Sequence, residues 1–179
     1  MEHHITEKVT HDAIVANWRR NAEKHGDMNY RFLRALKRRA SSHTWHKVDE
    51  TAARLHTEVF GIIDCKQCAN CCRSMSIRIT DADIPRISKH LGMKHKEFIA
   101  SYLRRDEDGD YYIKTSPPCP FLKGNLCSIY EIRPEKCRDY PFTDRPDFLF
   151  SSMMHASNAT VCPAVFHIVE TLKRETRQR

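Results

Sequence analysis

The chain has 179 residues and carries 30 lysine and arginine residues against 23 aspartate and glutamate residues, a formal charge of +7. This length suffices for one compact core or for a core with a helical extension. No apolar run is long enough for a membrane span, and the polar N-terminus does not resemble a secretory signal. We therefore expect a cytoplasmic protein whose thiols stay reduced.

The first third of the sequence has the pattern of amphipathic helices. Apolar residues recur at helical spacing over residues 11–25, and Gly26 follows as an expected C-terminal cap. Asp27 is then expected to cap a second helix that turns its basic residues outward. A third helix over about residues 42–63 has apolar residues at alternating steps of three and four. It is expected to lead directly into the first cysteines.

Short elements are predicted after these cysteines. Residues 75–79 alternate between apolar and polar side chains, as in a half-buried strand. Thr80 is expected to cap a helix that ends at Gly92, and residues 96–105 repeat the helical pattern. After a polar turn, residues 111–113 form a further candidate strand.

Regular patterns fade over residues 116–146, where six prolines and three cysteines occur. A segment without its own apolar core needs another constraint, and a metal held by its cysteines would supply one. Pro163 is well placed to begin a last helix. We predict a mainly α protein with a small β element, an α+β fold. Its expected parts are an N-terminal helical region over 1–64 and a cysteine-cluster metal-binding domain over 65–179, which together form one compact unit.

Basic residues are concentrated in two patches that could contact phosphates or anionic lipid. Solvated helix faces have the same composition, and this simpler interpretation is preferred, so nucleic acid is a weakly supported partner and any protein partner is unknown. The patches comprise Arg31, Arg34, Lys37, Arg38 and Arg39, and Lys173, Arg174, Arg177 and Arg179.

The cysteines are the most informative residues of the chain. Four of the eight form the motif C-x-x-C-x-x-C-C, and thiolates at this density repel one another unless a cation lies among them. Four disulfides would require an oxidising compartment, which we do not expect. We predict that the cysteines bind metal in one or two centres. The candidate ligands are Cys65, Cys68, Cys71, Cys72, Cys119, Cys127, Cys137 and Cys162.

An iron–sulfur cluster and zinc are the two candidate cofactors. Cys65, Cys68 and Cys71 have the spacing of the ferredoxin run C-x-x-C-x-x-C, which a remote Cys-Pro pair completes. Cys119 and Cys162 both precede proline. Zinc sites usually combine two C-x-x-C knuckles, and no second knuckle follows the first. The spacing favours an iron–sulfur cluster, expected to be of the 4Fe-4S type, over Zn²⁺. One of the adjacent Cys71 and Cys72 is a candidate spare that packs as a small apolar residue.

Four segments together resemble the YkgJ-like cysteine-cluster family, the CxxCxxCC domain proteins described as zinc- or iron-chelating. The match extends from Cys65 to Phe142, and Cys162 is a further candidate member. The resemblance implies metal binding and leaves the biochemical role open. A related cluster occurs in the longer flagellin lysine N-methylases. The segments are C-K-Q-C-A-N-C-C at 65–72, C-P-F-L at 119–122, C-S-I-Y-E-I-R-P at 127–134 and C-R-D-Y-P-F at 137–142.

Residues near the cysteines suggest supporting roles but no catalytic group. Arg133 and Arg138 could donate hydrogen bonds toward the centre, and Tyr130 and Tyr140 could shield it, although holding the irregular segment together explains them equally well. The chain lacks a Gly-rich phosphate loop, a G-x-S-x-G elbow and a Rossmann fingerprint. The leading hypothesis is an iron–sulfur protein with a redox, sensing or accessory role. The alternatives are a structural zinc module that binds a partner and a methyltransferase-like enzyme that uses the cluster as a scaffold.

Overall fold

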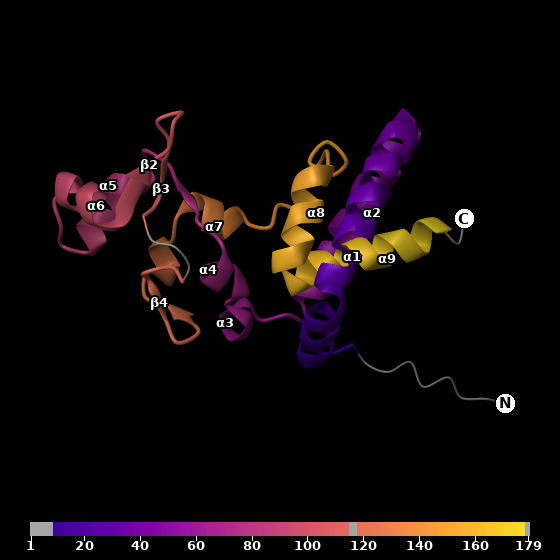
Figure 1. Cartoon of the computed structure of the whole chain (residues 1–179), viewed down its shortest axis with the longest axis horizontal. Coiled ribbons are helices and arrows are strands. Elements are labelled where there is room, and N and C mark those ends of the chain that lie inside the picture. The colour runs from indigo at the N-terminus through magenta and orange to yellow at the C-terminus, as the bar shows by residue number, and fades with distance from the viewer. Residues whose placement is uncertain (1–8, 115–117, 178–179) are drawn as a thin grey trace. The chain divides into compact units, whose positions relative to one another are not determined.

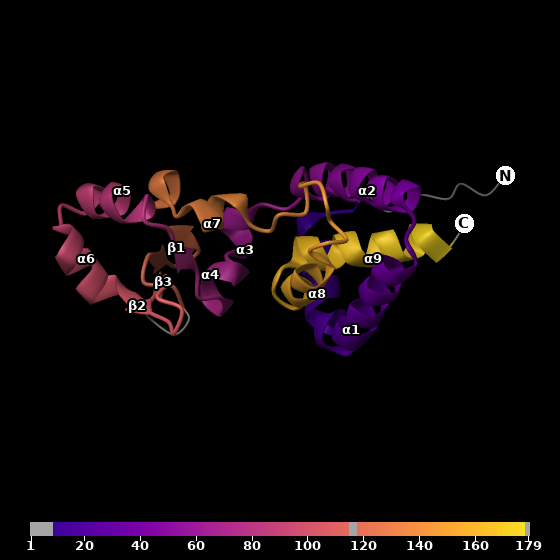
Figure 2. The same cartoon turned by 90° about the horizontal axis from the view of Figure 1, so that it is seen from above.

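The computed structural model describes residues 9–114 and 118–177. The chain divides into two compact units, each of which is described by itself (Figures 1 and 2). The helical unit comprises Met1–Asp64 and Pro141–Arg179, and the cysteine unit comprises Cys65–Tyr140. The predicted fold class is confirmed, because the described part is mainly helical with two small antiparallel sheets. The division differs from the expected one in that the C-terminal segment groups with the N-terminal helices.

The helical unit begins with α1, a single helix over His11–Arg39. The predicted break at Gly26 is therefore wrong. Glycine inside a helix costs about 1 kcal/mol, but packing along the whole length of α1 offsets this cost. A Cβ atom at Gly26 would lie 3.7 Å from Cγ2 of Thr160, so the helix that carries Thr160 passes close to α1 at this point.

Three further helices belong to this unit in the described part of the chain. Helix α2, Ser42–Phe60, is capped by Ser41 and confirms the third predicted helix. Helix α8, Ser152–Val161, was not predicted, whereas α9, Pro163–Arg177, begins at the expected proline. Helix α9 contributes more buried apolar side chains to this core than any other helix of the unit, and it contacts α1, α2 and α8. None of the helices in the described ranges is both long enough and apolar enough to cross a membrane.

Helix α8 carries a fully buried histidine. The His155 ring stacks on Phe148 at a centroid distance of 4.2 Å, and neither ring nitrogen has a hydrogen-bond partner among the described residues. Burial lowers the pKa of His155 to about 4, because the charged imidazolium would lose its hydration in the core.

We expect His155 to make the helical unit sensitive to acid. Between pH 6.5, the ordinary pKa of histidine, and pH 4, the unfolded chain binds a proton that the folded chain does not. Stability should therefore fall by about 3 kcal/mol as the pH is lowered across this window. Both tryptophans, Trp18 and Trp45, lie in this unit, so their fluorescence during urea unfolding reports its stability alone.

Two variants test this expectation. His155→Leu should make the pH dependence shallower, with a part remaining because burial also lowers the pKa of His167 in the same unit. Replacing an exposed histidine of this unit, as in His43→Gln, should leave the pH dependence unchanged. An unchanged slope in His155→Leu would contradict the assignment.

The cysteine unit consists of short elements around a small core. Residues 103–105, expected to be helical, form a strand instead, because they pair with the predicted strand at 111–113. The first strand is shorter than expected, and Thr80 does not cap the helix that follows it. The helices and turns are α3 (Cys65–Cys68), α4 (Asn70–Ser74), α5 (Asp83–His90), α6 (His95–Tyr102), the 3₁₀ helix η1 (Tyr130–Ile132) and α7 (Glu135–Asp139). The strands are β1 (Arg78–Ile79), β2 (Leu103–Arg105) and β3 (Tyr111–Ile113) in the order β1-β3-β2, and the hairpin β4 (Leu122–Lys123) and β5 (Leu126–Cys127).

The apolar core of the cysteine unit supports the thiols. Strands β1 to β3 and helices α5 and α6 contribute buried side chains such as Ile79, Ile87 and Phe98. Cys119 and Cys127 pack against this core. The segments that carry these two cysteines therefore rest on a formed scaffold.

Candidate metal centre

All eight cysteines lie in the described part of the chain, and none of them forms a disulfide. The structure divides them between the two units. Cys162 lies between α8 and α9 and packs against the core of the helical unit. The other candidate ligands belong to the cysteine unit, and they are Cys65, Cys68, Cys71, Cys72, Cys119, Cys127 and Cys137.

The C-x-x-C-x-x-C-C motif forms two single helical turns that meet at Ala69. This residue is buried and left-handed, with φ 47°, a conformation that costs an alanine about 1–2 kcal/mol. The left-handed backbone at Ala69 separates the two turns, so Cys65 and Cys68 lie on the first turn and Cys71 and Cys72 on the second. Strain of this kind persists where the surrounding contacts require it, which is common at functional sites.

Four of the thiols influence one another electrostatically, and they come from four separate segments. The backbone brings two of these segments together, because the Cys119 amide donates a hydrogen bond of 2.8 Å to the Cys72 carbonyl. Cys127 follows on β5, where it pairs with Leu122 across the hairpin. Cys137 lies on α7, and its ionisation is coupled to that of the other three cysteines.

These couplings shift the pKa values of the thiols. Burial, together with repulsion from the neighbouring thiolates, raises the pKa of Cys119 to about 11 and that of Cys137 to about 12. Burial also raises the pKa of Cys127, against the attraction of Arg133. A hydrogen bond from Cys71 lowers the pKa of Cys72 to about 7, with burial opposing and the charge of Arg73 adding to the effect.

The chemistry of this donor set fits a metal centre. Because the pKa values of three of these thiols are raised, they become thiolates only beside an opposing positive charge, which a metal ion or cluster supplies while it displaces the thiol protons. Within the described residues, however, no three histidine, cysteine, aspartate or glutamate side chains are close enough together to hold a single ion. The four thiols therefore lie near one another but not as close together as the ligands of a single metal ion.

Arg73 and Asn125 connect the cysteine motif to the β4–β5 hairpin. The Arg73 guanidinium donates to the carbonyls of Cys68, at 2.9 Å, and Gly124, at 3.2 Å, and to the side-chain oxygen of Asn125. Asn125 in turn donates to the carbonyl of Gln67 at 2.9 Å. These bonds fix the position of the hairpin, and therefore of its cysteine, relative to the first cysteine turn.

A buried carboxylate positions α7, the helix that carries Cys137. Asp83 is only 1% exposed and accepts a hydrogen bond of 3.1 Å from the amide of Glu135, the first residue of α7. It also accepts from the amide and hydroxyl of Thr80, both at 2.9 Å, and forms an ion pair with Arg86. The Asp83 side chain therefore joins the residues just before α5 to the start of α7.

The predicted supporting residues are partly accounted for. Arg133 lies near enough to Cys127 to lower its pKa, and its guanidinium stacks over the Tyr130 ring at 4.0 Å. The ammonium of Lys66 lies 4.7 Å from the centre of the same ring. The roles suggested for Arg138 and Tyr140 stay predictions.

Sequence reasoning did not identify Arg73, Arg86 or Asn125 as site residues. The one sequence signal for Arg73 was its position directly after Cys72, the last cysteine of the motif. The other two act through backbone carbonyls that only the folded chain brings within reach.

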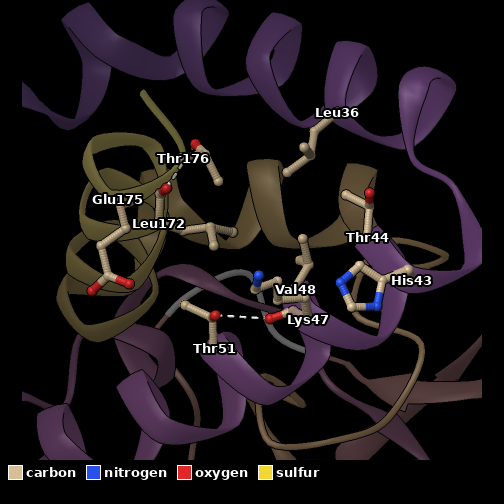
Figure 3. A pocket seen from close by; sticks show the side chains of 9 residues that line it. All are labelled: Leu36, His43, Thr44, Lys47, Val48, Thr51, Leu172, Glu175 and Thr176. Carbon is tan, nitrogen blue, oxygen red and sulfur yellow. Dashed lines mark hydrogen bonds between the residues drawn. The ribbon is translucent and has the colours of Figure 1, made fainter. Parts of the chain in front are cut away.

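The helical unit also contains a pocket of about 290 Å³ between α1, α2 and α9 (Figure 3). Its lining includes the apolar side chains of Leu36, Val48 and Leu172. Of its polar groups, the Thr51 hydroxyl donates to the Lys47 carbonyl. The Glu175 carboxylate is bound by Arg54, whose Nη2 lies 2.8 and 2.9 Å from the two carboxylate oxygens. Because these groups already have partners, the thiols remain the better candidate site.

Comparison with known proteins supports metal binding by this chain. No curated protein and no protein of solved structure shows a significant match to this chain. One family model matches residues 64–163, more than half of the chain, and its description is "Putative zinc- or iron-chelating domain". The matched range includes all eight cysteines and supports metal binding in general terms. The chain belongs to the CxxCxxCC family of zinc- or iron-chelating domains.

Proposed function

We propose that this protein holds a cysteine-ligated iron–sulfur cluster, with Cys72, Cys119, Cys127 and Cys137 as its primary ligands. The single observation that carries the proposal is the gathering of four half-buried thiols from four segments of one unit, two of which are joined by the hydrogen bond from the Cys119 amide to the Cys72 carbonyl. The thiols are close enough to shift one another's pKa values. Four cysteine ligands complete the coordination of a 4Fe-4S cluster. The role that follows is redox, sensing or accessory, in a cytoplasm that keeps the thiols reduced.

The spacing of the thiols favours a cluster over a single ion. In a tetrahedral zinc site the sulfurs lie about 2.3 Å from the metal and therefore about 3.8 Å from one another. No three potential ligand side chains of the described residues converge as a single ion requires, although the four thiols remain within electrostatic reach. A cluster holds its ligand sulfurs farther apart than a single ion does, which supports the cluster over the ion.

The remaining cysteines of the motif are candidate ligands of a second metal centre or alternative ligands of the first. Cys71 contacts Cys72 through a hydrogen bond, and Cys65 and Cys68 lie on the preceding turn. These three thiols form the candidate second centre, or the alternative ligands of the first. Cys162 lies in the helical unit and is not part of the ligand set proposed here, so its role as a ligand rests on the sequence alone.

A structural zinc centre is the second candidate function. The observation in its favour is that no helix of the cysteine unit exceeds eight residues and no strand exceeds three, in the part of the unit that the structure describes. Elements this short gain stability from a cross-link, and four thiolates are a common structural zinc set. The function would then lie in binding a partner.

Metal analysis combined with an absorption spectrum tests the proposal on full-length protein purified without oxygen. We expect iron and acid-labile sulfide in equal amounts and a broad band in the blue that bleaches on reduction. Stoichiometric zinc in a colourless protein would overturn the iron–sulfur assignment and establish the zinc alternative.

A further inference from the structure

Helix α1 presents a basic stripe on the side that faces away from the core of the helical unit. Helix α1 contacts α8 and α9. At 100° per residue, its buried positions, such as Ile14, Ala22 and Leu33, share one side of the helix. A second set of positions, again at steps of three and four, lies about 180° around the helix from them. All members of this set are exposed, and they are Arg20, Lys24, Asp27, Arg31, Arg34 and Arg38, called the basic stripe below.

The five cations of the basic stripe have no partner within the described residues. None of them forms a hydrogen bond, an ion pair or a ring contact there. The arginines of the cysteine unit differ, because most of them are engaged. Arg73 and Arg86 donate to backbone carbonyls, Arg104 covers the Tyr112 ring, and Arg78 pairs with Asp110.

We propose that the basic stripe binds the phosphate backbone of double-stranded nucleic acid. From Arg20 to Arg38 the helix rises about 27 Å, which corresponds to about eight base pairs of a duplex strand. Four of the five cations are arginines, whose planar guanidinium matches phosphate in bidentate geometry. The set includes one acidic residue, Asp27, which leaves a net charge of about +4 for polyanion binding. DNA and RNA share this backbone chemistry.

An anionic membrane surface is the less suitable occupant. Helices that lie in the membrane interface insert an apolar side beside their basic side. In α1 that apolar side is buried against α8 and α9 and contributes Ile14 and Leu33 to the core of the helical unit. The stripe itself contains no apolar residue. Electrostatic attraction without insertion suits a polyphosphate better than a lipid surface.

The salt dependence of binding measures the number of phosphates contacted. With five contacts, the affinity for a fluorescein-labelled duplex should fall about 500-fold between 50 and 200 mM salt. Neutralising two contacts should reduce this fall to about 40-fold. Fluorescence anisotropy on the full-length, metal-loaded protein gives both values, with duplex DNA and duplex RNA measured side by side to distinguish the source of the backbone.

The test variant is Arg31→Gln combined with Arg34→Gln. Its matched control is Lys89→Gln combined with Lys96→Gln, which removes the same charge from exposed positions of the cysteine unit. The test pair should bind more weakly and show the smaller salt effect, whereas the control pair should behave like the unmodified protein. Tryptophan fluorescence verifies that the helical unit of each variant is folded.

Three results would overturn the proposal. They are the absence of duplex binding at 50 mM salt, an equal loss of affinity in the control pair, and binding to vesicles with anionic lipid headgroups but not to either duplex. The metal content of the test pair should equal that of the unmodified protein, so failure of this proposal is distinguishable from failure of the metal assignment.

Discussion

Replacing Cys72 by serine is expected to release the metal and to unfold the cysteine unit. Cys72 influences the ionisation of Cys119, Cys127 and Cys137, and its carbonyl accepts the Cys119 amide. Serine keeps the backbone contact and removes the sulfur ligand. In small metal domains the binding free energy, about 10–16 kcal/mol for structural zinc, is also folding free energy. Because the helices and strands of this unit are short, its small apolar core is not expected to keep it folded without the metal.

The matched control is Cys162→Ser, which removes a cysteine from the helical unit. We expect this variant to keep its full metal content, with a small loss of stability from the partly buried position. Metal analysis measures the first effect, and far-UV circular dichroism measures the loss of the short helices. Tryptophan fluorescence should show the helical unit of Cys72→Ser still folded. Equal metal loss in both variants would make Cys162 a ligand, and full metal content in Cys72→Ser would refute the proposed set.

The helices were predictable where apolar residues recur at helical spacing along the sequence. Helix α2 shows this plainly, because its stripe and its Ser41 cap agree. The break at Gly26 was wrong because a local glycine preference of about 1 kcal/mol is smaller than the packing free energy of a long helix. Helix α8 was not predicted because its buried side includes polar residues such as Ser152 and Asn158, so apolar residues do not recur at helical spacing there. Only the folded unit reveals that such a helix is internal.

The sequence predicted which cysteines are candidate ligands but not which of them lie near one another in the fold. The motif identified the cysteines because dense thiols have few uses in a reducing compartment. Spacing along the chain suggested Cys65, Cys68 and Cys71 as a set, whereas the structure couples Cys72 with the cysteines of later segments. The left-handed backbone at Ala69 separates the two turns of the motif. No sequence pattern specifies that reversal for an alanine.

Replacing Asp83 by alanine is expected to weaken the metal centre without touching a ligand. The variant leaves the Arg86 guanidinium without its ion-pair partner and removes the acceptor for the Glu135 amide at the start of α7. Breaking a buried ion pair from one side costs about 3–5 kcal/mol, and the lower value applies because Arg86 is one-third exposed. Helix α7, and with it Cys137, should become less rigidly placed.

The rate at which a chelator removes the metal is the informative measurement for this variant, because it reports the position of Cys137 as well as stability. Asp83→Ala should release metal faster and melt at a lower temperature than the unmodified protein. Asp81→Ala removes an exposed carboxylate two residues away and should change stability by less than about 0.5 kcal/mol. If both variants released metal at the unmodified rate, the hydrogen bond from α7 to Asp83 would not be what positions the last ligand. A faster release confined to Asp83→Ala would establish a carboxylate outside the ligand set as a determinant of metal retention.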